Sequence, residues 1–348
     1  MKSVTIGAKA VGDGSRCFVI AEAGSNHNGR LEEAKALIRI AADAGADAVK
    51  FQTFRAEKLY ARNAGRSDYL QLDKPIFDII AAMEMPYEWL PQLADEAQRH
   101  GVLFLSTPFD EESADALEPY VPAYKIASYE MTHLPLVRYI ANKGKPLIIS
   151  TGTANLDEVR ETVAAVRATG NEQLIMLQCT ASYPAPLDSL NLRAMTTMRN
   201  ELEVLVGLSD HSREPLIGPV AAIALGACVI EKHFTFNNEL PGPDHRFAIE
   251  PHELRAMIRG IRECEAALGT GEKRFSGVEE ELRQFARRTI LTTKAIASGE
   301  TLTKENIAVL RAGNVPHGLA PAAFDSVLGR NARRALDAGV PVTENDLA

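Results

Sequence analysis

The chain has 348 residues, 46% of them hydrophobic and 24% charged, and its formal net charge at pH 7 is −8. This is the composition of a globular protein with room for about two domains, and acidity without a basic stripe argues against a nucleic-acid partner. The four cysteines are far apart, which argues against a disulfide framework or a zinc knuckle and predicts reduced thiols. No apolar run reaches membrane-spanning length and the N-terminus lacks a signal-peptide core, so we predict a cytoplasmic protein without a membrane partner.

Apolar strands alternate with amphipathic helices along most of the chain. The predicted strands are 17–24, 46–54, 102–108, 123–128, 145–151, 173–180, 204–211 and 229–235. The predicted helices are 31–45, 87–101, 111–120, 134–144, 156–170, 190–203, 217–227 and 251–269. Between about 55 and 86 the periodicity is lost, and we predict a loop with a short helix that lies over the strand ends.

Eight strand–helix units in a row predict a closed (β/α)8 barrel, a TIM barrel, rather than an open sheet. The active site of such a barrel lies at the carboxyl ends of its strands. The polar residues at these ends combine anion-binding and metal-binding types, and they are Glu22, Lys50, Gln52, Thr107, Lys125, Ser128, Thr151, Tyr183, Ser209, His211 and His233.

The pattern changes after the eighth helix. We assign residues 1–270 to the barrel, 271–288 to a linker and 289–348 to a small β-rich domain. Within that domain AIASGETLTKENIA (295–308) recurs in weaker form as ALDAGVPVTENDLA (335–348). Each copy predicts a strand, a glycine turn and a helix capped by a threonine.

Two histidines suggest a metal site, because His211 and His233 occupy corresponding positions at the ends of neighbouring strands. Two imidazoles placed in this way can hold one divalent metal. The lack of a cysteine ligand favours Mn²⁺ or Mg²⁺, with zinc as a further alternative. Glu231 shares one face of its strand with His233. Two roles stay open for it, the support of a metal ligand and a buried ion pair.

Lys50 and Lys125 close two apolar strands, where an unpaired ammonium group is costly. Beside the hydroxyl groups of the barrel mouth they predict an anion site for phosphate and carboxylate. Glu22 either pairs with one of these lysines or orients and deprotonates a reacting hydroxyl or water. Asp244, in the rigid segment PGPDH, either binds hydroxyl groups or belongs to a surface loop. Cys179 is expected to be a buried structural thiol.

Nine motifs carry a resemblance to a known family. In chain order they are IAEAGSNHNG, VKFQTF, STPF, AYKIAS, STG, CTASYPAP, GLSDH, EKHF and PGPDH. Together they resemble the N-acetylneuraminate (sialic acid) synthases and their relatives that make legionaminic and pseudaminic acids. The resemblance covers nearly the whole chain, because the last part is similar to the antifreeze-like (SAF) domain of that family.

The resemblance implies an enzyme that condenses phosphoenolpyruvate with an open-chain N-acetylmannosamine-type aldose, giving a nine-carbon 2-keto acid and phosphate. It implies catalytic roles for Glu22, His211 and His233, the two histidines holding Mn²⁺ or Mg²⁺. The implied phosphoenolpyruvate contacts are Lys50, Thr107, Lys125, Ser128 and Ser209, and the implied sugar contacts are Gln52, Glu130, Tyr183 and Asp244. It further implies a domain-swapped homodimer, in which the SAF domain of one subunit covers the barrel mouth of the other and Arg311 touches the N-acetyl group.

Three features depart from the usual family pattern. Ala312 stands where proline usually follows the arginine, SRE (212–214) follows GLSDH, and Gln178 precedes CTASYP. We expect these positions near the sugar end of the site, so the identity of the aldose stays open. Two other functions are weighed against the synthase, namely a metal-dependent class II aldolase or barrel hydrolase that does not use phosphoenolpyruvate, and a non-catalytic sugar-binding protein.

Overall fold

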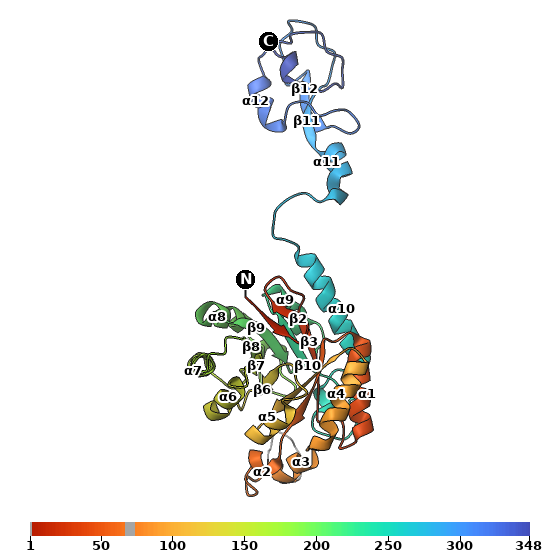
Figure 1. The fold of residues 1–348 in the computed structure, drawn as a ribbon. Coiled ribbons are helices and arrows are strands. Elements are labelled where there is room, and N and C mark those ends of the chain that lie inside the picture. The colour runs from red at the N-terminus through yellow and green to blue at the C-terminus, as the bar shows by residue number, and fades with distance from the viewer. Residues whose placement is uncertain (1, 67–73) are drawn as a thin grey trace. The chain divides into compact units, whose positions relative to one another are not determined.

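The computed structural model describes residues 2–66 and 74–348 (Figure 1). The contacts within the chain divide it into two units, Met1–Gly269 and Thr270–Ala348. Each unit has an apolar core of its own.

Eight parallel strands form the main sheet of the first unit, and they confirm the predicted barrel. The strands are β3 (Phe18–Gly24), β4 (Ala48–Thr53), β5 (Leu103–Pro108), β6 (Tyr124–Ile126), β7 (Leu147–Ser150), β8 (Leu174–Cys179), β9 (Leu205–Asp210) and β10 (Val229–His233). Their order is β5-β4-β3-β10-β9-β8-β7-β6. Because β5 also lies against β6, the sheet nearly closes on itself (Figure 1).

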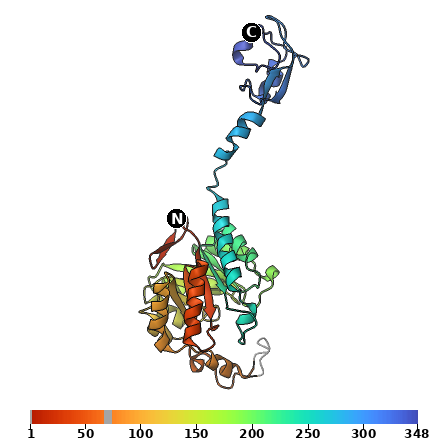
Figure 2. The same ribbon diagram turned by 90° about the vertical axis from the view of Figure 1, so that its right-hand side faces the viewer.

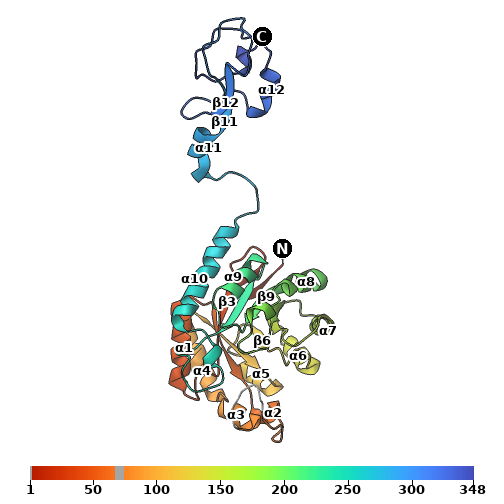
Figure 3. The same cartoon turned by 180° about the vertical axis from the view of Figure 1, so that it is seen from behind.

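Helices surround this sheet (Figure 2). They are α1 (Leu31–Ala44), α4 (Leu90–Arg99), α5 (Glu111–Leu117), α6 (Leu134–Ala141), α7 (Leu156–Arg167), α8 (Arg193–Leu202), α9 (Ile217–Ala224) and α10 (Pro251–Leu268). The long helix α10 packs beside both α1 and α9 (Figure 3). The apolar side of the helices and the outward side chains of the strands share one large core.

Side chains alternate along each strand, so that one set points into the barrel and the other toward the helices. The inward set begins with an apolar layer that includes Ile20 and Leu105. A hairpin that the sequence analysis did not predict, formed by β1 (Ser3–Ile6) and β2 (Lys9–Gly12), adds Val4 to the same cluster. The barrel interior is therefore filled by side chains below the level at which polar residues begin.

The segment between β4 and α4 was predicted to be a loop with one short helix. Its described part contains two, α2 (Ala56–Leu59) and α3 (Ile76–Ala82), followed by the 3-10 turn η1 (Tyr87–Trp89). The prediction for positions 67–73 lies outside the described residues.

The second unit is built on a two-stranded antiparallel sheet of β11 (Arg288–Thr292) and β12 (Ile307–Arg311). The helix α11 (Glu280–Ala286) precedes it, and the single turn α12 (Phe324–Val327) follows. The small core of the unit includes Ile290 among other apolar side chains.

The strand and the helix predicted in each copy of the repeat were both wrong. Where the strands were predicted, the described residues of the two copies form only one isolated bridge, between Ile296 and Leu336. In the first copy, Asn306 Oδ1 accepts a hydrogen bond from the backbone of Thr303 at 2.7 Å, and the chain then enters β12. The second copy forms one 3-10 turn, η6 (Glu344–Asp346). In both copies a buried apolar residue follows at once, Ile307 or Leu347, and its burial in the sheet core overrides the local helix signal.

In the part of the chain that the structure describes, no helix is both long enough and apolar enough to cross a bilayer.

Candidate active site

Above the apolar layer, inward side chains become polar, and six of them gather into one buried group. They are Glu22 on β3, Lys50 on β4, Thr107 on β5, Lys125 on β6, Ser209 on β9 and Glu231 on β10, and each is at most 4% exposed. Alternation places them there, since Glu22 follows the inward Ile20 by two residues and Lys50 follows Ala48 in the same way. We call these six residues the lysine pocket.

Opposite charges are paired within the lysine pocket. Lys50 Nζ lies 2.8 Å from Glu22 Oε2 and donates a hydrogen bond to Thr107 Oγ1 at 3.1 Å. Glu231 lies between the two lysines, with its oxygens 3.8 Å from Lys50 Nζ and 3.5 Å from Lys125 Nζ. Of the two roles left open for Glu231, the structure shows the buried ion pair. Two ammonium groups thus face two carboxyl groups.

The environment separates the pKa values of the two carboxyl groups. Burial raises the pKa of Glu22 to about 7, although Lys50 opposes the shift. Burial also acts to raise the pKa of Glu231, but Lys125 and Lys50 outweigh it and lower that pKa. Burial lowers the pKa of Lys125, whereas for Lys50 burial is outweighed by Glu22 and Glu231 and the pKa is raised. Glu22 is therefore the carboxyl group of the pocket that can exchange a proton near neutral pH.

The two predicted metal ligands face each other beside the lysine pocket. The ring centres of His211 and His233 are 5.4 Å apart. A metal lies about 2.1 Å from a coordinating imidazole nitrogen, hence about 3.2 Å from the ring centre, so two rings that share one ion can be up to about 6.4 Å apart. His211 Nδ1 lies 3.0 Å from the carbonyl oxygen of Thr180. His233 Nδ1 is buried and has no hydrogen-bond partner within residues 2–66 and 74–348, which fits a nitrogen that binds a metal.

A histidine ring must be neutral to bind a metal, so the pKa values of His211 and His233 matter for the proposed metal site. Burial, with His211 and Lys50 nearby, holds the pKa of His233 well below its usual value, so the ring is neutral as coordination requires. For His211 burial is outweighed by the Cys179 thiol, 3.7 Å away, and the pKa is raised. Among the described residues no third His, Cys, Asp or Glu joins the pair. Such a donor set leaves positions for water or substrate oxygen, as Mn²⁺ and Mg²⁺ prefer.

A cavity of about 690 Å³ opens beside His233. Its polar lining includes four predicted sugar contacts, Gln52, Glu130, Tyr183 and Asp244. Burial raises the pKa of Glu130 to about 7 and that of Asp244 to about 6. Glu130 Oε2 is buried without a hydrogen-bond partner in the described part of the chain. Apolar side chains of α2 and α3 line another side, including Leu59, Ile76, Ile79 and Ile80.

Gly24 allows Asp244 to reach the cavity. The backbone of Gly24 has φ +53°, and an added Cβ would lie 2.9 Å from Asp244 Oδ2 and 3.5 Å from the ring of His233. A shift in the pairing register between β3 and β4 occurs at this same strand end. Asp244 therefore lines the site, and of its two predicted roles the surface-loop role was wrong.

The prediction of Thr151 as the polar residue at the end of β7 was wrong. Ser150, and not Thr151, lies beside Lys125, with 2.7 Å between Lys125 Nζ and Ser150 Oγ. The hydroxyl of Thr151 donates instead to the carbonyl of Leu177 at 3.0 Å. Strict alternation from the inward Ile148 would have identified Ser150.

Two further residues, Cys179 and Phe247, lie at the site although they were not predicted to belong to it. Cys179 ends β8 on its inward face, and its Sγ lies 3.5 Å from Ser128 Oγ. Ser128 also accepts a hydrogen bond of 2.9 Å from the backbone of Gly152. The ring of Phe247 packs 5.0 Å from His233 and 5.1 Å from Tyr183, centre to centre. Strand alternation could have identified Cys179, and the position of an aromatic residue just after PGPDH could have identified Phe247.

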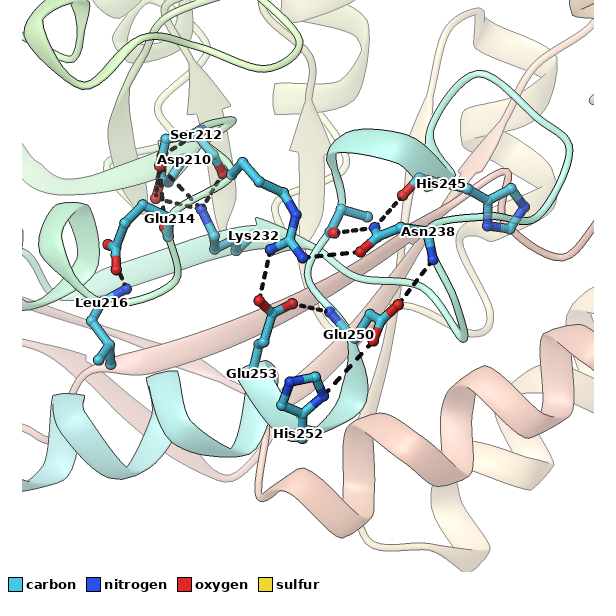
Figure 4. Close-up of polar contacts among 12 residues, drawn as sticks. Asp210, Ser212, Glu214, Leu216, Lys232, Asn238, His245, Glu250, His252 and Glu253 are labelled. Atoms are coloured by element: carbon cyan, nitrogen blue, oxygen red, sulfur yellow. Dashed lines mark hydrogen bonds and ion pairs between the residues drawn. The ribbon is translucent and has the colours of Figure 1, made fainter.

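Gln178 and the segment 212–214 were expected near the sugar end of the site, and this expectation was wrong. Gln178 alternates with the inward Cys179, and its amide donates to the carbonyl of Leu190 in the helix layer. The hydroxyl of Ser212 is bonded to the side chain of Asp210, whose strand position also faces outward (Figure 4). Outward positions cannot contact a ligand inside the barrel mouth.

Arg311 belongs to the second unit, where it ends β12 and is exposed. The next residue, Ala312, is buried, and its backbone N–H donates to the carbonyl of Arg287 at 3.1 Å. Proline has no N–H to donate, so alanine permits a hydrogen bond that the usual family residue cannot make. The role of Arg311 stays a prediction.

Comparisons with known proteins identify the family of this chain. Residues 37–273 match the model of the NeuB family, and residues 287–348 match that of the SAF domain. The spore coat polysaccharide biosynthesis protein SpsE of Bacillus subtilis (strain 168) is 43% identical, over 100% of this chain and 98% of that protein. The N,N'-diacetyllegionaminic acid synthase of Legionella pneumophila is 40% identical, over 96% of this chain and 95% of that enzyme.

A solved structure extends the comparison to three dimensions. The N-acetylneuraminic acid synthetase of Leptospira borgpetersenii, crystallised in complex with citrate, is 32% identical. It aligns with a TM-score of 0.73 over 81% of this chain and 95% of that chain. This chain therefore belongs to the NeuB family, as a sugar-acid synthase with a C-terminal SAF domain.

Proposed function

We propose that this enzyme condenses phosphoenolpyruvate with an open-chain N-acetylmannosamine-type aldose, giving a nine-carbon 2-keto acid and phosphate. One observation carries the proposal. Two buried lysines, held among hydroxyl groups, open onto the same mouth as a pair of imidazoles 5.4 Å apart. An aldolase that does not use phosphoenolpyruvate has no need of such a lysine pair, and neither has a sugar-binding barrel.

The reaction balances as follows. C3 of phosphoenolpyruvate forms a bond with the aldehyde carbon, water adds at C2, and the bond between C2 and the phosphate oxygen breaks. Of the two protons of water, one goes to the former aldehyde oxygen and one leaves with phosphate. Glu22, with its pKa near 7, is suited to take a proton from water and to return it to the nascent hydroxyl group.

The charged groups of phosphoenolpyruvate need fixed positive partners in a site largely screened from water. Lys50 and Lys125 supply them, each already oriented by a hydroxyl group, Thr107 or Ser150. The buried hydroxyl groups of Ser128 and Ser209 donate to Cys179 Sγ and Glu231 Oε1 in the structure, and we propose that they turn to phosphoenolpyruvate when it binds. Buried charges arranged before the substrate arrives cost no reorganisation during the reaction.

We propose that His211 and His233 hold a divalent metal, with Mn²⁺ preferred and Mg²⁺ as an alternative. When bound, the metal supplies Lewis-acid polarisation of the aldehyde oxygen. The rings are kept in place by the Thr180 carbonyl on one side and by the packed rings of Tyr183 and Phe247 on the other.

The aldose is proposed to occupy the cavity beside His233. Gln52, Glu130 and Asp244 offer hydrogen-bonding groups to its hydroxyl and amide groups. The apolar wall of α2 and α3 suits methyl groups, such as that of an acetamido group or a 6-deoxy carbon. We therefore expect a 2,4-diacetamido-2,4,6-trideoxy aldose to be a better substrate than N-acetylmannosamine, in keeping with the likeness to a legionaminic acid synthase.

We further propose a domain-swapped homodimer in the cytoplasm, in which Arg311 of one subunit contacts the N-acetyl group of a sugar bound to the other. The support is the family resemblance together with the exposure of Arg311 at the end of β12.

The test is the release of inorganic phosphate from phosphoenolpyruvate. We expect release when phosphoenolpyruvate, Mn²⁺ and either aldose are present, and loss of release when any one of the three is omitted. The ratio of kcat/KM for the two aldoses measures the sugar preference. Aldol cleavage without phosphate release would support the aldolase, and sugar binding without turnover would support the binding protein.

A further inference from the structure

A second buried ion pair lies directly behind the two histidines. Lys232 on β10 and Asp210 on β9 are register partners, and Lys232 Nζ is 2.6 Å from Asp210 Oδ2. Their side chains are 1% and 0% exposed. Both point outward, away from the lysine pocket, so neither can touch a substrate within the barrel mouth.

The pair is bonded to the turn that follows β9 (Figure 4). Asp210 Oδ1 accepts a hydrogen bond from the backbone of Ser212 at 2.8 Å, and Asp210 Oδ2 accepts one from Ser212 Oγ at 3.1 Å. Lys232 Nζ donates to the carbonyl oxygen of Ser212 at 2.7 Å. We call Asp210, Ser212 and Lys232 the strand-end cluster.

The strand-end cluster brackets both proposed metal ligands. His211 lies between Asp210 and Ser212 in the chain, so the bonds across that tripeptide fix its backbone. Lys232 precedes His233 directly, and its bond to Ser212 joins the end of β10 to the turn after β9. The separation of the two imidazoles is thus set by groups on the opposite side of the strands.

Helix α9 seals the cluster from water. Gly218, in the first turn of this helix, approaches so closely that an added Cβ would lie 2.9 Å from Asp210 Oδ2. Glu214 links the turn to the same helix, because its carbonyl accepts from Ser212 Oγ at 3.2 Å and its carboxylate from the backbone of Leu216 at 2.8 Å. No bulkier residue fits at position 218 without displacing the carboxylate.

Stability alone does not account for such an arrangement. Replacing a buried ion pair by apolar side chains of similar size is often neutral or stabilising, because the cost of removing both charges from water is avoided. What an apolar pair cannot reproduce is the direction of the three hydrogen bonds described above between the pair and Ser212. What the ion pair provides, and an apolar pair would not, is therefore the geometry of the turn that follows β9.

We propose that the strand-end cluster is a positioning device that holds His211 and His233 at the separation needed to share one divalent cation. This rests on the proposed metal site. None of the three residues touches the metal or a substrate, so the cluster acts through the two histidines.

The experiment measures binding of Mn²⁺ alone to the full-length protein by calorimetry and by electron paramagnetic resonance. Asp210→Asn and Lys232→Met each break the pair, and we expect Mn²⁺ affinity to fall 10- to 100-fold, as for other groups that orient metal ligands. The double variant Asp210→Leu/Lys232→Met removes both charges. We expect it to regain thermal stability and yet to keep the weakened Mn²⁺ binding.

A matched control removes another short ion pair from the barrel. Arg39 on α1 and Glu96 on α4 are joined at 2.6 Å, away from the histidines. The variant Arg39→Met/Glu96→Leu is expected to bind Mn²⁺ as the wild type does. The single substitution Ser212→Ala, which removes one hydroxyl and keeps the ion pair, is expected to weaken Mn²⁺ binding several-fold and covers the case in which the charge variants fail to fold.

The outcomes separate this inference from the proposed function. If the wild type does not bind Mn²⁺, the metal site itself fails and the inference with it. If the wild type binds, but Ser212→Ala and the double variant bind equally well, the positioning role is overturned while the metal site stands. A double variant that regains both stability and Mn²⁺ affinity would show that the pair serves folding alone.

Discussion

At the scale of single residues, strand alternation identified most of the lysine pocket. Glu22 and Lys50 could be predicted because each is a charged, inward-facing residue at the end of an apolar strand. Burying a charge there is costly, so such a residue indicates a binding or catalytic site. Glu231 could not be assigned in the same way, since its role depends on the distances to two lysines on other strands. Those distances follow from the closure of the barrel and are not visible in any one segment.

Lys125→Met should weaken the binding of phosphoenolpyruvate more than the binding of the aldose. The ammonium group provides a charge-assisted hydrogen bond worth about 1.5–3 kcal/mol, which is on the order of a 10- to 150-fold change in the Kd for phosphoenolpyruvate. Calorimetric titration with phosphoenolpyruvate measures this. Lys58→Met, on the exposed part of α2, is the matched control, and equal affinity in both variants would contradict the assignment of Lys125.

Glu130→Gln should change how stability depends on pH. Burial raises the pKa of Glu130 from 4.5 to about 7, so its contribution to stability is complete below pH 4.5 and is lost as the pH rises through 7. The variant has no such loss. We expect its free energy of unfolding to exceed that of the wild type by up to about 3 kcal/mol at pH 8.5, with the difference vanishing near pH 4.5.

Urea denaturation at several pH values measures this difference. Glu57→Gln, which removes an exposed carboxylate from α2, controls for the general effect of lost charge. If the free energies of unfolding of Glu130→Gln and wild type differ by the same amount at every pH, the pKa of Glu130 is not raised by burial.

At the scale of elements, the sequence predicted the eight strands and their helices because both periodicities are strong and are repeated. It failed where tertiary packing overrides a local signal. The turns after Thr303 and Thr343 have good helix caps, but the buried residues that follow enter the core of the second unit. The hairpin of β1 and β2 was missed because four-residue strands give too little pattern to detect.

The end of β3 offers a test of how an element places Asp244, a group that we propose to bind the aldose. Gly24→Ala should cost about 1–2 kcal/mol of stability, since an alanine at positive φ is strained. It should also raise the KM for the aldose, because the added Cβ meets Asp244 Oδ2 at 2.9 Å. Gly29→Ala is the matched control, with φ +68° and nothing within 4 Å of its Cβ.

Steady-state kinetics and thermal melts of the two variants separate strain from displacement. Both should lose stability, and only Gly24→Ala should alter the KM for the aldose. A normal KM in Gly24→Ala would show that Asp244 does not bind the sugar.

At the scale of the whole molecule, the sequence predicted both the barrel and the C-terminal SAF domain, as the family matches show. The contribution that we propose for the second unit could not be predicted from composition or periodicity, and it comes only from the family resemblance, which assigns it to Arg311. Arg311 and Arg288 are register partners on β12 and β11. Substitution of Arg288 is therefore a matched control for substitution of Arg311 within the same small sheet.

Arg311→Ala should raise the KM for the aldose at least tenfold and leave that for phosphoenolpyruvate nearly unchanged, because a hydrogen bond from a charged group to the sugar is lost. Arg288→Ala should leave both values unchanged. Initial-rate kinetics with each substrate varied in turn measures the effect. Parallel rises in the two KM values would argue against a lid role for this residue.

The pairing of charges in the lysine pocket links phosphoenolpyruvate, proposed to bind there, with the metal proposed to bind to the adjoining histidines. With two ammonium groups against two carboxyl groups, a phosphorylated enol arriving by itself brings excess negative charge into a buried site, and a dication by itself brings excess positive charge. Each ligand relieves the imbalance that the other creates, so their affinities must be thermodynamically coupled, and by the same factor in both directions. A mixture of Mn²⁺ and phosphoenolpyruvate should saturate the enzyme at concentrations where neither does so alone.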